Sequence, residues 1–412
     1  MINLYPLYID PGTGSMLFSI LVGAAATLYF LIRALVIKLK VVLSGGRAVS
    51  SSDTNLYAVY NEGSQYCNVF KPILDDFERR QIEVLYLTSA DKDPALEAGY
   101  KYIKPEFIGE GNKAFARLNI LSANVLLMTT PGLNVYQLKR SKMVKHYAHI
   151  LHMPSDATMY RLFGIDYYDS ILLTGDYQAK DIRTLETLRN LPQKQLVTVG
   201  CTYLDAAFEK AKNIPKEEQH PFTVLISPSW GPSALLSRYG SNLLDPLVKT
   251  GWRIIVRPHP QSKKSENAVL EKLTERYKDA ANLEWDFSSD NIYSLLKSDI
   301  MISDFSGIIY DYIFLCDKPV IYVTHKFDLR PYDADDLGDN AVEELWQFKT
   351  LKEIGIELKE EYFNSIADII QKTSDNSELK AARQKARETA WAYQGECGKR
   401  VVDFLINTVN NA

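Results

Sequence analysis

Small and polar residues crowd one strand-to-helix turn of the sequence. The stretch "DIMISDFSGIIYDYIFLCDKPVIYV" holds an apolar run typical of a buried strand, then one typical of a buried helix. A helix N-terminus has unpaired N–H donors and partial positive charge, and glycine allows close backbone approach, so this turn predicts a phosphate cradle. A capped turn without a ligand is the alternative interpretation. The residues of the turn are Ser303, Asp304, Ser306 and Gly307.

A second stretch, "IIVRPHPQS", also places polar residues after an apolar run. The predicted strand Ile254–Val256 leads into Arg257, and His259 stands between two prolines that prevent a helix there. The guanidinium fork matches phosphate oxygens, and the imidazole can donate to an anion or transfer a proton. An exposed loop histidine is the alternative. The chain has no G-x-x-x-x-G-K-[ST] motif, which argues against a P-loop.

Three histidines recur at every third position of "KHYAHILHMPSD", namely His146, His149 and His152. The run is typical of a strand, so His146 and His152 share one face and His149 lies on the other. No second pair of ligands is near in sequence, and we therefore predict no metal site. His152 ends the strand just before Pro154, which makes it a candidate general base. The reaction rate should then decrease as the pH drops below the ordinary histidine pKa of about 6.5.

Short β-rich runs alternate with amphipathic or charged stretches between residues 56 and 323. This alternation predicts parallel sheets with right-handed crossovers, in which ligands bind at the carboxyl ends of the strands. The polar stretch "KNIPKEEQHPF" contains two prolines and predicts an inter-domain hinge. We expect an α/β fold of two doubly wound Rossmann-type domains that face a cleft, over residues 55–215 and 216–375, followed by a C-terminal helix over 376–412.

The N-terminal region is different in character. No charge occurs from Pro11 to Ile32, and about 20 apolar residues span a bilayer core. Basic residues follow this run and only Asp10 precedes it, which predicts a single-pass protein of the cytoplasmic membrane with its body in the cytoplasm. A buried N-terminal helix is the alternative. We expect an extracytoplasmic tail over 1–14, a transmembrane helix over 15–42 and a linker over 43–54.

Composition indicates the size of the hydrophobic core, the kinds of partner and the redox compartment. The 412 residues are 46% hydrophobic and 24% charged, which is enough for more than one globular core. The formal net charge of −4, without a long block of like charges, argues against a nucleic-acid partner. The four cysteines are far apart and form no C-x-x-C pair, which favours free thiols in a reducing compartment.

The combination of "RPHP" with "DIMISDFSGIIYDYIFLCDKPVIYV" resembles the donor half of the CDP-glycerol glycerophosphotransferases, the teichoic-acid primases and polymerases. "TVLISPSWGP" and "LVTVGCTYLD" resemble two further elements of that family, and the resemblance covers roughly residues 120 to 350. It implies a GT-B-like architecture with an N-terminal acceptor domain and a C-terminal nucleotide-donor domain. It further implies membrane association and transfer of glycerol phosphate from CDP-glycerol, or a similar CDP-alcohol, to a lipid-linked or polymer acceptor, without a cofactor.

The resemblance also assigns residues. His152 and His259 are expected to be catalytic, and the donor-binding set is Arg257, Ser303, Asp304, Ser306, Gly307 and Asp311. The family usually has Trp-His-Gly-x-Pro where this chain has "LHMP" (151–154), and usually a second serine at the position of Gly307. Residues 1–50 lack the long helical extensions of the large polymerases, which favours a short transfer. A GT-B glycosyltransferase that uses a nucleotide sugar and a non-catalytic envelope scaffold are the two other hypotheses.

Overall fold

The computed structural model divides into two compact units, Met1–Thr54 and Asn55–Ala412. In the first unit the described residues are helical, whereas the rest of the predicted transmembrane segment, the tail and the linker lie outside the described residues. Among the residues that are described, no helix has the length and apolar character needed to cross a membrane. The structure describes residues 22–24, 27–29, 31–32, 55–215, 220–288, 290–323 and 345–411.

The first half of the larger unit is built on a seven-stranded sheet with the order β3-β2-β1-β4-β5-β6-β7, in which every pairing is parallel. The winding reverses between β1 and β4, so their carboxyl ends form the crevice in which doubly wound sheets bind ligands. The strands are β1 (Asn55–Asn61), β2 (Val84–Thr88), β3 (Ile103–Phe107), β4 (Ala123–Met128), β5 (Val144–Ile150), β6 (Ser170–Leu173) and β7 (Gln195–Thr198).

Helices cover both faces of this sheet, which is why its central strands are apolar on both sides. In β4, Val125 and Leu127 pack beneath α2 (Cys67–Arg79) and α15 (Cys397–Asn410). Leu126 and Met128 pack on the opposite face, with residues of α3 (Asn112–Leu118) and α4 (Tyr177–Leu188). The edge strand β3 was not predicted, because four of its five residues are at least partly exposed and it contains a proline, which an edge strand tolerates.

The second half is built on a six-stranded parallel sheet with the order β10-β9-β8-β11-β12-β13. The predicted strand Ile254–Val256 corresponds to β9, and the apolar runs before and after the predicted buried helix correspond to β11 and β12. The switch point lies between β8 and β11. The strands are β8 (Thr223–Ile226), β9 (Arg253–Val256), β10 (Leu283–Trp285), β11 (Ile300–Ser303), β12 (Val320–Tyr322) and β13 (Gly355–Glu357).

Two hydrophobic clusters cover the two faces of the second sheet, and α5 packs on both halves of the unit, against α2 and α11. The first cluster contains residues of α5 (Thr202–Lys212), α10 (Ile292–Lys297), α11 (Ile308–Cys316), α12 (Trp346–Ile354) and α14 (Ser377–Ala390). The second contains residues of α6 (Leu235–Arg238), α7 (Gly240–Val248), α9 (Asn267–Arg276) and α13 (Ile366–Ser374). The short α8 (Ser262–Ser265) precedes α9.

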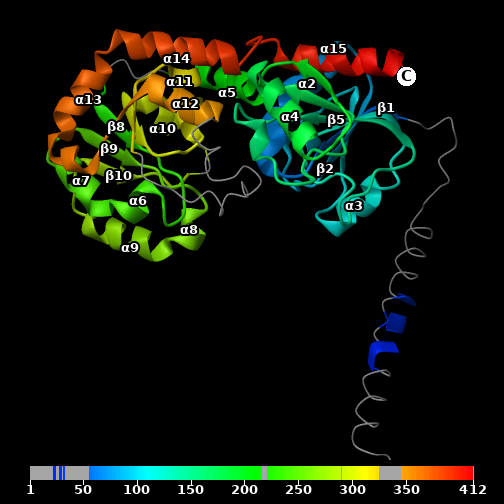
Figure 1. Cartoon of the computed structure of the whole chain (residues 1–412), viewed down its shortest axis with the longest axis horizontal. Helices are drawn as coiled ribbons and strands as arrows, with labels where there is room; N and C mark the ends of the chain where they lie inside the picture. Colours follow the sequence, from blue (N-terminus) through cyan, green and yellow to red (C-terminus); the bar gives the residue numbers. More distant parts are fainter. Residues whose placement is uncertain are drawn as a thin grey trace, which may run out of the picture. The chain divides into compact units, whose positions relative to one another are not determined.

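The C-terminal stretch 376–412, expected as one helix, is two helices (Figure 1). Helix α14 packs on the second half and α15 returns to the first. Asp205, at the start of α5, holds the turn between them, because its carboxylate accepts hydrogen bonds from Trp391 Nε1 at 2.9 Å and from the backbone N–H groups of Gly395 at 2.9 Å and Cys397 at 3.0 Å. Gly200 makes this approach possible, since a Cβ there would lie 2.1 Å from the Ala392 carbonyl oxygen.

Candidate active site

Two adjoining cavities lie between the two sheets. The first, of about 370 Å³, is called the aromatic pocket because Tyr66, Tyr160, Trp230, Phe305, Tyr310 and Phe348 line it. The second, of about 530 Å³, is called the polar pocket because Ser64, Gln65, Asn68, Lys210, Arg257, Asp290 and Asn291 line it. Five residues line both pockets, namely Met153, His259, Ser306, Gly307 and Asp311.

His152 lines the aromatic pocket from the first half. It follows β5, and its Nδ1 lies 3.2 Å from Oγ1 of Thr129, which follows the neighbouring strand β4. The ring of Tyr66 meets the imidazole edge to face, with centroids 5.0 Å apart. Burial lowers the pKa of His152 to about 4, so the imidazole is neutral near pH 7 and can accept a proton.

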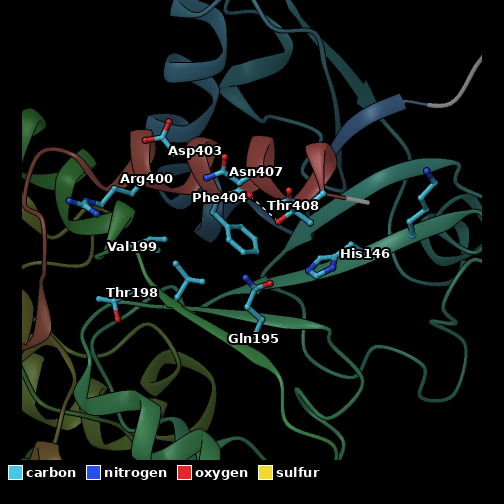
Figure 2. A pocket seen from close by; sticks show the side chains of 12 residues that line it. His146, Gln195, Thr198, Val199, Arg400, Asp403, Phe404, Asn407 and Thr408 are labelled. Carbon is cyan, nitrogen blue, oxygen red and sulfur yellow. Dashed lines mark hydrogen bonds between the residues drawn. The ribbon is translucent and has the colours of Figure 1, made fainter.

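The other two histidines of the run lie elsewhere. His149 is fully buried, with its Nε2 3.1 Å from the Tyr160 hydroxyl. His146 lines a separate cavity of about 640 Å³ beneath α15, shown in Figure 2, and its Nε2 lies 2.9 Å from Ser170 Oγ. The three rings therefore do not converge. In the part of the chain that the structure describes, no group of His, Cys, Asp or Glu side chains is placed to hold a metal ion.

His259 approaches both pockets from the second half. Its Nδ1 accepts a hydrogen bond from the backbone N–H of Gln261 at 3.1 Å, so the neutral ring carries its proton on Nε2. Burial lowers the pKa of His259, although Glu266 opposes the shift. The ring lies 6.4 Å from that of Trp230, centroid to centroid. Among the described residues Nε2 has no hydrogen-bond partner, and the N–H of a neutral imidazole is a donor suited to an anionic oxygen.

Only part of the predicted phosphate cradle faces the pockets. The buried Ser303 hydroxyl donates to the Ser227 carbonyl oxygen at 2.6 Å and lines neither cavity. The Asp304 carboxylate accepts four backbone N–H bonds, from Ser229, Leu235, Phe305 and Ser306, at distances of 2.8 to 3.2 Å. Burial raises its pKa while these bonds oppose the shift.

Ser303 and Asp304 therefore hold the loop after β8 against the turn after β11. Ser306 and Gly307 are the members of the turn that line the pockets, immediately before α11 begins at Ile308. The surface that could receive a phosphate is thus smaller than the sequence implied. It consists of the Ser306 hydroxyl and the backbone at the start of α11.

Arg257 lines the polar pocket, but its guanidinium is largely occupied. It forms an ion pair with Asp286 and donates to the hydroxyl and the carbonyl oxygen of Ser288 at 3.1 Å and 2.9 Å. Burial tends to raise the pKa of Asp286, yet bonds from Ser288, Ser294 and Arg257 lower it to about 2. Arg257 consequently fixes the segment after β10 as well as presenting positive charge to the cavity.

Asp311, on the first turn of α11, lines both pockets. Burial raises its pKa to about 7, while hydrogen bonds from Tyr203 and Asn291 oppose the shift. The Tyr203 hydroxyl donates to Oδ2 at 3.1 Å. Near neutral pH both the protonated and the ionised form of this carboxyl are therefore populated, a property that the sequence did not indicate.

Several site residues were missed from sequence. Thr129 follows a strand that was predicted, so the rule that ligands bind at carboxyl ends could have identified it. Tyr66 ends one short 3-10 helix and Tyr160 follows another, and neither position carries a strand signal. Asp156 connects the two halves, because its carboxylate accepts from the backbone N–H groups of Trp346 at 2.7 Å and Gln347 at 3.0 Å, at the start of α12. No sequence pattern indicates that pairing.

Two doubly wound parallel sheets with a ligand-sized cleft between them define a protein of the GT-B-like class. Residues 192–407 match the family model described as CDP-Glycerol:Poly(glycerophosphate) glycerophosphotransferase, and the chain belongs to that family. It is accordingly a transferase of the CDP-glycerol glycerophosphotransferase type. No curated protein sequence matches it.

Solved structures share the fold. The wall teichoic acid polymerase TagF is 14% identical, with a TM-score of 0.53, over 86% of this chain and 89% of that chain. A putative UDP-N-acetylglucosamine 2-epimerase from Listeria monocytogenes is 14% identical, with a TM-score of 0.55, over 87% of this chain and 98% of that chain. The UDP-GlcNAc 2-epimerase of Methanocaldococcus jannaschii is 12% identical, with a TM-score of 0.55, over 86% of this chain and 100% of that chain.

Proposed function

We propose that the protein transfers glycerol phosphate from CDP-glycerol, or a similar CDP-alcohol, to an acceptor hydroxyl and releases CMP. One observation carries this proposal. A neutral imidazole from the first half, His152, lines the same cavity as a neutral imidazole from the second half, His259, and the start of α11. A base on one side of a cleft and anion donors on the other are what an in-line phosphoryl transfer requires.

The reaction follows from these positions. His152 removes the proton from the acceptor hydroxyl, whose oxygen attacks the β-phosphorus. The bond from that phosphorus to the oxygen bridging the two phosphates breaks, and CMP leaves with the bonding electrons. The Nε2–H of His259, the Ser306 hydroxyl and the N–H groups at the start of α11 stabilise the negative charge on the diphosphate. Such preorganised donors are the main source of rate enhancement in phosphoryl transfer.

In this proposal some of the remaining predicted donor residues contact the donor directly, and others act only by supporting the turn. Gly307 permits close approach of the diphosphate to the backbone, and Arg257 contributes charge from the polar pocket. Ser303 and Asp304 act indirectly, because they hold the backbone of the turn in place. Asp311 binds a hydroxyl of the donor, as an acceptor when ionised and as a donor when protonated.

The cellular setting belongs to the same proposal. A solved structure of a variant of the wall teichoic acid polymerase TagF with CDPG is 13% identical, with a TM-score of 0.54, over 88% of this chain and 91% of that chain. This similarity supports a teichoic-acid-related acceptor, either lipid-linked or the end of an envelope polymer. The predicted transmembrane segment 15–42 would anchor the enzyme in the membrane, with the catalytic body on the cytoplasmic side, because basic residues follow its apolar run.

Turnover of labelled CDP-glycerol by the full chain, in the presence of a membrane lipid extract, tests the proposal. We expect release of CMP and a labelled phosphodiester product, both lost in His152→Ala. UDP-N-acetylglucosamine and other nucleotide sugars serve as competing donors. Turnover of a nucleotide sugar but not of CDP-glycerol would favour a glycosyltransferase, and binding of CDP-glycerol without turnover would favour a scaffold.

A further inference from the structure

Thr129 and His152 form a hydroxyl–imidazole pair that lines the aromatic pocket, in which Thr129 is buried and His152 is half-buried. Thr129 is 1% exposed and stands at the carboxyl end of β4, beside the switch point of the first sheet. Its Oγ1 lies 3.2 Å from Nδ1 of His152, within hydrogen-bond distance. The other ring nitrogen, Nε2, has no such neighbour among the described residues and belongs to a side chain that lines the pocket. The two nitrogens of His152 therefore have different environments.

This difference matters because a neutral imidazole has one N–H and one lone pair. A base that accepts the substrate proton at Nε2 must start with its own proton on Nδ1. After the transfer both nitrogens carry a proton, and Nδ1–H again needs an acceptor. The Thr129 hydroxyl oxygen can accept that bond before and after the transfer without moving.

Two further contacts restrict the ring and its backbone. The Tyr66 ring packs edge to face on the imidazole, with centroids 5.0 Å apart. The Cys201 thiol, at the N-cap of α5, lies 3.9 Å from the His152 carbonyl oxygen and donates a weak hydrogen bond to it. The Tyr66 ring contacts the imidazole in the orientation that places Nδ1 opposite the Thr129 hydroxyl.

We propose that Thr129 is the positioning residue of the reaction, which holds His152 as the Nδ1–H tautomer so that Nε2 is the proton acceptor. The inference rests on the proposed role of His152 as general base. It adds a residue that no motif of the sequence identifies. Thr129 does not itself touch the reacting atoms, and its effect is transmitted through the imidazole.

The chain offers a matched control pair. The Ser170 hydroxyl lies 2.9 Å from Nε2 of His146, which is also a hydroxyl–imidazole pair on neighbouring strands of the same sheet. That pair lies beside the cavity beneath α15 and lines neither pocket of the cleft. Loss of the Ser170 hydroxyl therefore perturbs a histidine without reaching the proposed base.

The experiment combines kinetics with nitrogen NMR of the full chain labelled with ¹⁵N-histidine. The wild type, Thr129→Val, Thr129→Ser, Ser170→Ala and His152→Ala are compared, and the His152 signals are identified by their loss in the last variant. We expect the wild-type His152 to carry its proton on Nδ1. In Thr129→Val a mixture of tautomers should appear and kcat should fall about 5- to 10-fold, the effect of one lost hydrogen bond, while the KM for CDP-glycerol stays within about twofold.

The controls separate positioning from packing. Thr129→Ser retains the hydroxyl and should restore at least about half of the wild-type kcat, and Ser170→Ala should match the wild type. A wild-type His152 protonated on Nε2 would overturn the inference even if Thr129→Val does not fold. So would a folded Thr129→Val that keeps both the tautomer and kcat. Failure of the proposed function looks different, because the wild type would then release no CMP from CDP-glycerol whatever the tautomer of His152.

Discussion

The side chain of Met153, from the first half, lies against Gly307, from the second half. Its Cε is 3.3 Å from the position that a Cβ on Gly307 would take, and both residues line the aromatic and the polar pocket. Both are positions at which the sequence departs from the family motifs that it resembles, as Leu151 also is. These two departures are therefore neighbours across the cleft, and the flexible thioether of Met153 occupies space that a larger residue at 307 would need.

The substitution Gly307→Ser tests this coupling. Alone it should lower kcat/KM several-fold, because the new side chain meets Met153. Adding Met153→Gly removes the obstacle and should recover activity, with a coupling free energy of at least about 0.5 kcal/mol in a double-mutant cycle. Steady-state kinetics with CDP-glycerol measure all four proteins. Strictly additive effects would mean that the two positions act independently.

The substitution His152→Ala tests the general base. The maximal rate should fall by about 10²- to 10⁴-fold while the KM for the donor changes little, because the imidazole acts on the acceptor hydroxyl. His146→Ala is the control, since that ring lies beside the cavity beneath α15. A His152→Ala enzyme with a normal rate would exclude this residue as the base, and Asp311 would be the next carboxyl to examine.

The pH dependence of the rate follows from burial. Because burial lowers the pKa of His152 to about 4, the base is neutral above that pH and is lost by protonation as the pH falls through it. The expectation of an acid limb near 6.5, drawn from the ordinary histidine pKa, is therefore replaced by one near 4. The profile of kcat against pH should show this limb in the wild type.

The Asp311 carboxyl is the control for that profile. Burial raises its pKa to about 7, so its titration falls near the limb at 6.5 that an ordinary histidine would produce. A limb near 7 that disappears in Asp311→Asn belongs to this carboxyl and leaves the assignment of His152 intact. An acid limb near 6.5 that persists in Asp311→Asn would show that His152 titrates like an exposed histidine, contrary to the structure.

Arg257→Ala should lower both the stability of the fold and the affinity for the donor, whereas Ser306→Ala should lower the affinity alone. Removal of Arg257 takes away the cationic partner of Asp286 and leaves only the hydrogen bonds from Ser288 and Ser294, so the melting temperature should fall along with donor affinity. Ser306→Ala should raise the KM for CDP-glycerol with little effect on melting, because no described contact of the fold depends on that hydroxyl. Equal melting temperatures for both variants and the wild type would contradict this assignment.

Much of the fold could be predicted from the sequence. Strands β9, β11 and β12 were predicted because a strand covered by helices on both faces is a short continuous apolar run. Parallel strands end at one edge of a sheet, so the residues after these runs were expected to gather there, and His152, His259 and Gly307 do line one cavity. Strands β3 and β13 escaped prediction because edge strands bury few of their residues.

The sequence by itself determined the buried strands of both sheets and which polar residues stand at their ends, because both depend on local patterns of apolar and polar residues. Tertiary structure decided what each polar residue does. The Asp304 carboxylate accepts hydrogen bonds from four backbone N–H groups. Arg257 forms an ion pair with Asp286, and the Thr129 hydroxyl lies within hydrogen-bond distance of His152. Such pairings join residues far apart in the chain. They depend on burial and distance, which are properties of neighbours in space that no local pattern encodes.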